Sequence, residues 1–220
     1  MAFNFSNGKL LALIKQGSYA GVLLDLDDTL YDYKICHEFA LRQTAKLWCQ
    51  KTGQTTEAFL NSYEEAQKAV KIYTLNQGAS HSRLLYFQNM SETKFGASKF
   101  KLTIELEKMY WDSFLTKIKL RLGVKDFLTE LKNLGLKTCI ITDLTASIQF
   151  AKVLKLNLSP LLDFIVSSEE AGVEKPAQKI FHLAQSKLGL PKGKLIMIGD
   201  DKNKDELGAK NFGIAYAGLD

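Results

Sequence analysis

The chain is poor in cysteine and proline and has no long hydrophobic run. Its 220 residues include 3 cysteines and 3 prolines. The longest apolar runs, such as residues 10–14, are far too short to cross a bilayer, and the N-terminus lacks the residue pattern of a signal peptide. Because 46% of the residues are hydrophobic, the chain can bury a substantial core. We therefore expect a globular protein of the cytoplasm with no membrane partner.

The cysteines and the charge exclude further classes. Cys36, Cys49 and Cys139 are odd in number and have neither CxxC nor metal-ligand spacing, which is typical of reduced, mostly buried thiols. The formal charge of +5 could favour anionic ligands, but the lysines are scattered and form no basic stripe with interleaved aromatic residues. We therefore expect no nucleic-acid partner. No pattern in the sequence specifies an oligomeric state.

Short runs rich in Ile, Leu and Val predict five strands. These runs span residues 21–26, 136–142, 164–167, 195–199 and 214–217. Helical patterns separate most of them, and two of these patterns end at Gly135 and Gly189. Strands that alternate with helices favour a parallel sheet covered on both faces. The predicted fold is therefore α/β, with a doubly wound, Rossmann-like parallel sheet.

Residues 31–121 interrupt this alternation. They contain helical apolar stripes and no convincing strand, and the polar stretch 91–98 is typical of a loop. We expect a catalytic core made of residues 1–30 and 122–220, with 31–121 inserted as an α-helical domain. A short additional helix is predicted at 9–16.

Acidic residues gather where two predicted strands end. The first strand runs into Asp25 and Asp27 in the stretch VLLDLDDTL, and the fourth into GDDKNKD, with Asp200, Asp201 and Asp205. Side chains two residues apart on an extended chain point the same way, so Asp25 and Asp27 can project together. Two carboxylates at such a short distance repel each other unless one is protonated or a cation compensates their charge. If the two strands are neighbours, these oxygens suit a hard cation, above all Mg²⁺.

Two further features belong to the same edge of the sheet. Thr142 and Asp143 end the strand KTCIITD, where a hydroxyl and backbone amides could hold a phosphoryl oxygen. Lys175 precedes Pro176, a residue typical of the first turn of a helix, so its ammonium would lie near a helix N-terminus, where anions are favoured. A metal, a lysine and oriented donors around a nucleophilic carboxylate describe a phosphoryl-transfer site.

The motifs DLDDT, ITD, EKP and GDDKNKD, in this order over residues 21–217, resemble the four motifs of the haloacid dehalogenase superfamily. The insertion resembles the helical cap of that superfamily's first cap class. The resemblance implies that Asp25 attacks phosphorus and forms an aspartyl-phosphate, while Asp27 protonates the leaving group and then activates water. Dehalogenases of the family lack an aspartate at the position of Asp27, which favours phosphate chemistry. Ala177 and Gln178 follow EKP where many relatives have DP, which leaves the chemistry intact.

The resemblance also implies the remaining roles. Thr142 and Lys175 would hold the phosphoryl group, and Lys175 would offset the charge on the nucleophile. Mg²⁺ would be held by Asp25, the backbone carbonyl of Asp27 and Asp200, with Asp205 and Asp201 in support.

We therefore expect a Mg²⁺-dependent phosphatase that hydrolyses a small phosphorylated metabolite through an aspartyl-phosphate. A phosphomutase would use the same aspartates but return the phosphoryl group to a sugar. A non-enzymatic phospho-aspartate switch is a second alternative, although a switch needs no acid such as Asp27. In a third interpretation, Asp27, Asp28 and Thr29 merely cap a following helix.

Overall fold

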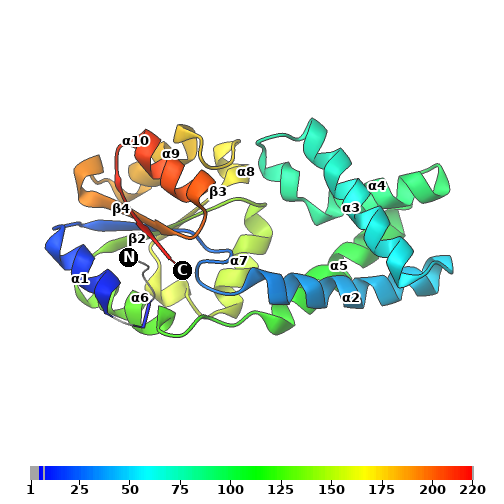
Figure 1. Ribbon diagram of the computed structural model, residues 1–220, viewed down its shortest axis with the longest axis horizontal. Helices are drawn as coiled ribbons and strands as arrows, with labels where there is room; N and C mark the ends of the chain where they lie inside the picture. Colours follow the sequence, from blue (N-terminus) through cyan, green and yellow to red (C-terminus); the bar gives the residue numbers. More distant parts are fainter. Residues whose placement is uncertain (1–4, 7, 220) are drawn as a thin grey trace. The chain divides into compact units, whose positions relative to one another are not determined.

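The computed structural model describes residues 5–6 and 8–219, and one of its two compact units contains a five-stranded parallel sheet (Figure 1). The strands are β1 (Gly21–Leu24), β2 (Lys137–Thr142), β3 (Phe164–Ser167), β4 (Leu195–Gly199) and β5 (Ala215–Gly218). Their spatial order is β3-β2-β1-β4-β5, and every neighbouring pair is parallel. This order confirms the predicted doubly wound α/β fold.

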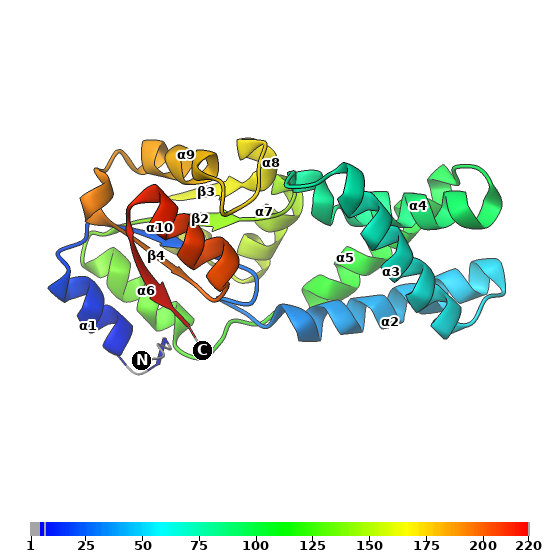
Figure 2. The ribbon, with the colours of Figure 1, turned by 45° about the horizontal axis from the view of Figure 1, so that its top comes forward.

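Helices cover both faces of the sheet. One face carries α8 (Ser168–Ala171), α9 (Gln178–Leu188) and α10 (Leu207–Phe212), and the other carries α1 (Lys9–Gln16) and α6 (Val124–Asn133) (Figure 2). Helix α7 (Ala146–Lys155) connects β2 to β3. The helix predicted at 9–16 is confirmed as α1. Three single turns of 3₁₀-helix span Gly78–His81, Ser159–Leu161 and Lys192–Lys194, and a π-helical turn spans Lys202–Glu206.

A cluster of buried apolar side chains lies beneath α9 and α10. Strand residues such as Leu23, Ile141 and Met197 pack against Phe181 and Phe212 of the two helices, and all are buried. Burial of such apolar surface is the main force that holds α/β layers together, at roughly 25 cal/mol per Å². The sheet is therefore a rigid base for the loops at its carboxyl edge.

The order in which the chain adds strands to the sheet reverses at β1, which pairs with β2 on one side and with β4 on the other. The pairing with β4 continues past the end of β1, where the Asp25 amide donates to the Ile198 carbonyl over 2.9 Å. Ligands of open parallel sheets bind at such switch points, outside the carboxyl ends of the strands. The acidic motifs that follow β1 and β4 therefore meet where a ligand site is expected.

Four longer helices form a separate compact unit, Tyr33–Ile118, while Met1–Asp32 and Lys119–Asp220 form the unit with the sheet. The helices are α2 (Tyr33–Thr52), α3 (Thr56–Tyr73), α4 (Arg83–Phe95) and α5 (Phe100–Lys117). Helix α2 packs against α3 and α5, and α4 packs against the same two. Their shared core is rich in aromatic residues, including buried Trp48, Phe59, Tyr86 and Phe114. Within residues 5–6 and 8–219, no helix combines the length and apolarity needed to cross a membrane.

The prediction of a loop at 91–98 is wrong for residues 91–95, which are helical. Helix α4 continues to Phe95 and ends at Gly96, whose φ of 66° is left-handed. Ser91 is fully buried in the helix, and its hydroxyl lies 3.3 Å from that of Thr103 on α5. A paired serine is compatible with a buried helix face, so the polar sequence there did not mark a loop.

Candidate active site

A buried lysine joins two aspartates at the carboxyl edge of the sheet. The Lys175 ammonium lies 2.6 Å from Oδ1 of Asp25, which follows β1, and 2.7 Å from Oδ1 of Asp205, in the turn after β4. All three side chains are buried. The loop that carries Lys175 is held by Asp143, whose Oδ1 accepts from the Lys175 amide over 2.9 Å. The motifs that follow three different strands thus converge on one cluster.

Asp200 completes an acidic triad with Asp25 and Asp205. One carboxylate oxygen from each lies within 4.8 Å of the others, and Asp200 is the most exposed of the three. Oδ2 of Asp25 is buried and has no hydrogen-bond partner among the described residues. One lysine cannot balance three carboxylates, so the cluster retains an excess of negative charge. Carboxylate oxygens from three aspartates this close together are a donor set that fits a hard divalent cation.

The pKa shifts in this cluster agree with the shortage of positive charge. Burial raises the pKa of the Asp25 carboxyl well above its usual range and outweighs the opposing effect of Lys175. Burial alone would lower the pKa of Lys175, but Asp205 and Asp25 raise it well above its ordinary value, so the lysine stays charged. Both directions mean that additional positive charge would stabilise the ionised carboxylates.

Asp27 lies in a different environment, surrounded by donors. The Lys152 ammonium lies 2.7 Å from its Oδ1 and 2.9 Å from its Oδ2, and the Tyr31 hydroxyl donates to Oδ1. The Gln149 amide donates to Oδ2 over 3.2 Å. Burial raises the pKa of Asp27, but the charge of Lys152 and the hydrogen bonds from Lys152, Tyr31 and Gln149 together lower it by more, so the net shift is below the usual value. Asp25 and Asp27 are therefore two residues apart but have opposite electrostatic environments.

Thr142 and Asp143 end β2 beside these groups. The buried Thr142 hydroxyl accepts from the Gln149 amide over 2.6 Å, so Gln149 connects Thr142 with Asp27. The Asp143 carboxylate is bound by its own neighbours, because its Oδ2 also pairs with the Lys204 ammonium over 2.8 Å. Because this carboxylate is already paired, the group of Asp143 that could bind a phosphoryl oxygen is its backbone amide.

The turn after β4 directs the side chains of Asp205 and Asp201 to different partners. Oδ1 of Asp201 accepts from the amides of Asn203 and Lys204, at 2.8 and 3.1 Å, so this carboxylate caps the π-helical turn. Asp201 is not part of the acidic triad. Its backbone amide instead donates to Oδ2 of Asp205 over 3.2 Å.

Two local expectations are wrong. Helix α9 begins at Gln178, with Ala177 as its N-cap, so Pro176 precedes the helix, and the ammonium of Lys175 pairs with carboxylates rather than with a helix N-terminus. The interpretation of Asp27, Asp28 and Thr29 as a helix cap also fails, because α2 begins only at Tyr33. The chain turns instead, with Asp28 at a φ of 63°, and the Thr29 hydroxyl donates to Oδ1 of Asp200 over 2.7 Å.

Four residues of the site were not found from the sequence. They are Thr29, Tyr31, Gln149 and Lys152. The last two lie three residues apart on the buried face of α7, where Ile148 is also buried. Two long polar side chains on the buried face of an amphipathic helix would have been a usable signal, since such groups need a polar partner.

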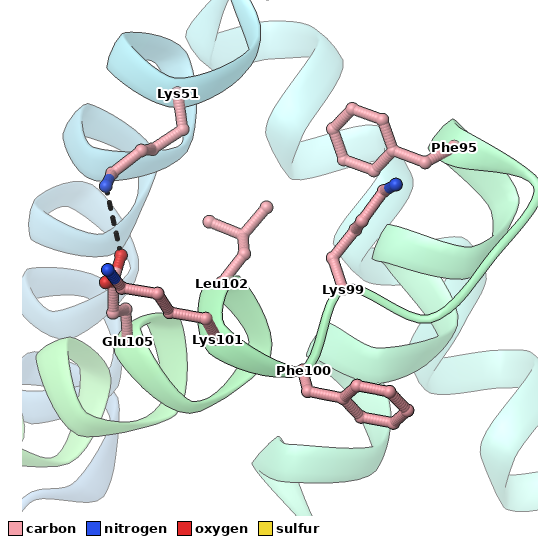
Figure 3. A pocket seen from close by; sticks show the side chains of 7 residues that line it. All are labelled: Lys51, Phe95, Lys99, Phe100, Lys101, Leu102 and Glu105. Atoms are coloured by element: carbon pink, nitrogen blue, oxygen red, sulfur yellow. Dashed lines mark ion pairs between the residues drawn. The ribbon is translucent and has the colours of Figure 1, made fainter.

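The helical unit has a cavity of its own, of about 620 Å³. Its lining contains none of the candidate residues; Figure 3 shows it as Lys51, Phe95, Lys99, Phe100, Lys101, Leu102 and Glu105. The Lys51 ammonium pairs with the Glu105 carboxylate over 3.1 Å across this cavity. The cavity offers no nucleophile and no acid–base pair comparable to the aspartates of the sheet edge.

The fold is a doubly wound α/β core with three clustered carboxylates beside a buried lysine at the edge of its sheet, and known proteins match this chain. The haloacid dehalogenase-like hydrolase family matches residues 19–213. The ribulose-1,5-bisphosphate 5-phosphatase of Halopiger xanaduensis is 35% identical over 195 residues, which cover 88% of this chain and 81% of that protein. The glyceraldehyde 3-phosphate phosphatase of Methanocaldococcus jannaschii is 28% identical over 195 residues, which cover 88% and 82%.

Comparison with a solved structure supports the fold and nothing further. The 2-haloacid dehalogenase of Pseudomonas syringae aligns with a TM-score of 0.74 at 20% identity, over 90% of this chain and 85% of that one. The chain therefore belongs to the haloacid dehalogenase-like hydrolase family, as its motifs predicted. It is a hydrolase, and its phosphatase relatives agree with the expected phosphomonoester chemistry.

Proposed function

We propose that the protein is a Mg²⁺-dependent phosphatase that hydrolyses a small phosphomonoester through an aspartyl-phosphate on Asp25. The observation that carries the proposal is Oδ2 of Asp25, a buried carboxylate oxygen without a partner among the described residues, next to Lys175 and two further carboxylates. A nucleophile needs such a free oxygen. Asp27 is assigned to proton transfer because of its place in the DLDDT motif, two residues after the nucleophile.

Two steps follow from these assignments. In the first, Oδ2 of Asp25 attacks phosphorus, the bond to the leaving oxygen breaks, and Asp27, which must enter this step protonated, gives its proton to that oxygen. In the second, Asp27 takes a proton from water, the water oxygen attacks phosphorus, and the bond to Asp25 breaks, which releases inorganic phosphate, restores the Asp25 carboxylate and leaves Asp27 protonated again. The leaving group departs as the alcohol.

The remaining residues bind and balance charge. The Thr142 hydroxyl, the Asp143 amide and the Lys175 ammonium hold the phosphoryl oxygens. Asp25, the Asp27 backbone carbonyl and Asp200 would hold Mg²⁺, with Asp205 in support and Asp201 acting only through its backbone amide, which donates to Asp205. Bound Mg²⁺ supplies positive charge that offsets the carboxylates and the developing charge on the phosphoryl group.

The substrate is proposed to be a small phosphorylated metabolite. By name, the two relatives act on ribulose-1,5-bisphosphate and glyceraldehyde 3-phosphate, so phosphorylated sugars are the first compounds to test. Residues 31–121, predicted as a cap domain, are proposed to select the substrate. The free thiols of Cys36, Cys49 and Cys139 support a location in the reducing cytoplasm.

The test is phosphate release from a panel of phosphomonoesters, with Mg²⁺ and with a chelator, for wild type and Asp25→Asn. We expect Mg²⁺-dependent release by wild type and none by Asp25→Asn. Asp126→Asn, the same change at an exposed position on α6, is the matched control and should retain activity. Isomerised sugar phosphate without free phosphate would instead indicate a mutase, and binding without turnover a switch.

A further inference from the structure

Lys152 is a fully buried lysine that the two-step chemistry does not use. It lies on α7, its side chain has no exposed surface, and its ammonium spans both oxygens of Asp27. A buried ammonium is strongly unfavourable unless it is paired. Its contact with both oxygens fixes the plane of the Asp27 carboxylate as well as its position, which a single hydrogen bond would not do.

Gln149 lies one helical turn before Lys152, on the same face of α7. Its Nε2 lies 2.6 Å from the Thr142 hydroxyl and 3.2 Å from Oδ2 of Asp27. One rigid helix therefore holds both the residue assigned to proton transfer and a residue assigned to the phosphoryl group. A catalytic geometry supported by a packed helix is more sharply defined than one supported by a loop.

Tyr31 closes the arrangement from the other side. Its hydroxyl donates to Oδ1 of Asp27, and the Lys152 ammonium lies 5.7 Å from the centre of its ring. Asp27 thus has donors on both oxygens, from β1's own loop and from α7. Free rotation of this side chain is removed before any substrate arrives.

We propose that Lys152 and Gln149 are positioning residues, which fix the Asp27 carboxyl group relative to Thr142 so that, once protonated, it lies within hydrogen-bond reach of the leaving oxygen of the bound phosphoryl group. This inference rests on the proposed function. Proton transfer requires hydrogen-bond distance to the leaving oxygen, and displacement of the donor removes its contribution to the rate. The loss should depend on how much the leaving group needs that proton.

The experiment compares two esters with different leaving groups. p-Nitrophenolate leaves from p-nitrophenyl phosphate without a proton, whereas the alkoxide of glycerol phosphate needs one. The kcat/KM values for both esters are measured for wild type, Lys152→Met, Gln149→Leu and Lys155→Met. Lys155 lies on the same helix but is exposed, so Lys155→Met is the matched control.

We expect the ratio of kcat/KM for p-nitrophenyl phosphate to that for glycerol phosphate to rise about 10-fold or more in Lys152→Met. The ratio should rise less in Gln149→Leu and stay unchanged in Lys155→Met. Equal losses for both esters would indicate a merely structural role and overturn the inference. Faster hydrolysis of glycerol phosphate by Lys152→Met would also overturn it, because Lys152 would then restrain Asp27 instead of aligning it.

Two outcomes separate the inference from the function on which it rests. If Lys152→Met does not fold, Gln149→Leu decides alone, since it leaves the pair of buried charges intact. An unchanged ratio in active Gln149→Leu then refutes the positioning role, while phosphatase activity stands. If wild type hydrolyses neither these esters nor the sugar phosphates, the proposed function fails and the inference fails with it.

Discussion

The Lys175 ammonium lies 2.6 Å from Oδ1 of Asp25, and both groups are buried. The same ammonium also serves Asp205 at 2.7 Å, so one positive charge is shared between two carboxylates. This sharing makes Lys175 important for the stability of the site, in addition to its proposed role in phosphate binding. A variant without the lysine would leave two buried carboxylates uncompensated.

Lys175→Met should therefore destabilise the protein by about 3–5 kcal/mol in a chelating buffer. The measurement is urea unfolding of wild type and variant. The double variant Lys175→Met/Asp205→Asn, which also removes one of the stranded charges, should recover part of the loss. A Lys175→Met protein as stable as wild type would contradict the view that this lysine compensates the cluster.

Gly199 ends β4 at a position where no side chain fits. A Cβ at this residue would lie 2.1 Å from Oδ2 of Asp205. Gly199→Ala should displace Asp205 from Lys175, destabilise the protein by about 1–3 kcal/mol and lower phosphatase activity. At Gly193 a Cβ would have no neighbour within 4 Å, so Gly193→Ala is the control and should be close to neutral. Equal thermal stability of the two variants would refute this reasoning.

Mg²⁺ should raise the melting temperature of the wild-type protein, because a ligand that binds only the folded state stabilises it by about 2.7 kcal/mol at one hundred times its Kd. Asp200→Asn should lose most of this shift.

Thr29→Val should weaken Mg²⁺ binding about 10-fold or more, since the Thr29 hydroxyl orients Asp200 through a 2.7 Å hydrogen bond. Thr29→Ser retains the hydroxyl and should behave like wild type; a Thr29→Val protein with unchanged Mg²⁺ affinity would speak against this role.

His37 should make the helical unit sensitive to acid. Burial and, to a smaller extent, the charge of Arg83 lower the pKa of His37 from 6.5 to about 4. Between these values the unfolded chain binds a proton that the folded chain does not, so stability falls as the pH is lowered from 6.5 to 4, by about 3 kcal/mol. His37→Asn keeps a polar group near the Tyr110 hydroxyl but cannot titrate. Urea unfolding across this range should show a smaller pH dependence for the variant, and identical slopes would refute the assignment.

Much of the fold followed from the sequence because its strongest signals are local. Runs of Ile, Leu and Val end at Asp25, Thr142 and Gly199, and strands in a doubly wound sheet present their carboxyl ends at one edge. The motifs could therefore be placed together without knowledge of any contact. The boundaries of helices and loops were predicted less well, since Pro176 lies before its helix and Ser91 lies inside one.

The support of Asp27 could not be predicted in the same way. Lys152 contacts Asp27 across 125 positions of sequence, and no local pattern encodes such a pair. Asp201 shows the opposite problem, because it resembles its neighbours in the motif but caps a turn instead of facing the cluster. Residues whose role depends on a distant partner need the folded chain to reveal them.

The two chain segments that join the helical unit to the sheet are paired with each other. Tyr31 bridges Leu120, and the Arg121 amide donates to the Leu30 carbonyl over 2.9 Å. The backbone pairing that joins the two ends of the insertion lies outside the helical unit. We therefore expect that the 86 residues of Tyr33–Ile118 can be exchanged as one unit. Junctions after Asp32 and before Lys119 preserve that fastening, so the helical unit of a relative could be transplanted there while Asp25, Asp27 and Lys175 keep their surroundings.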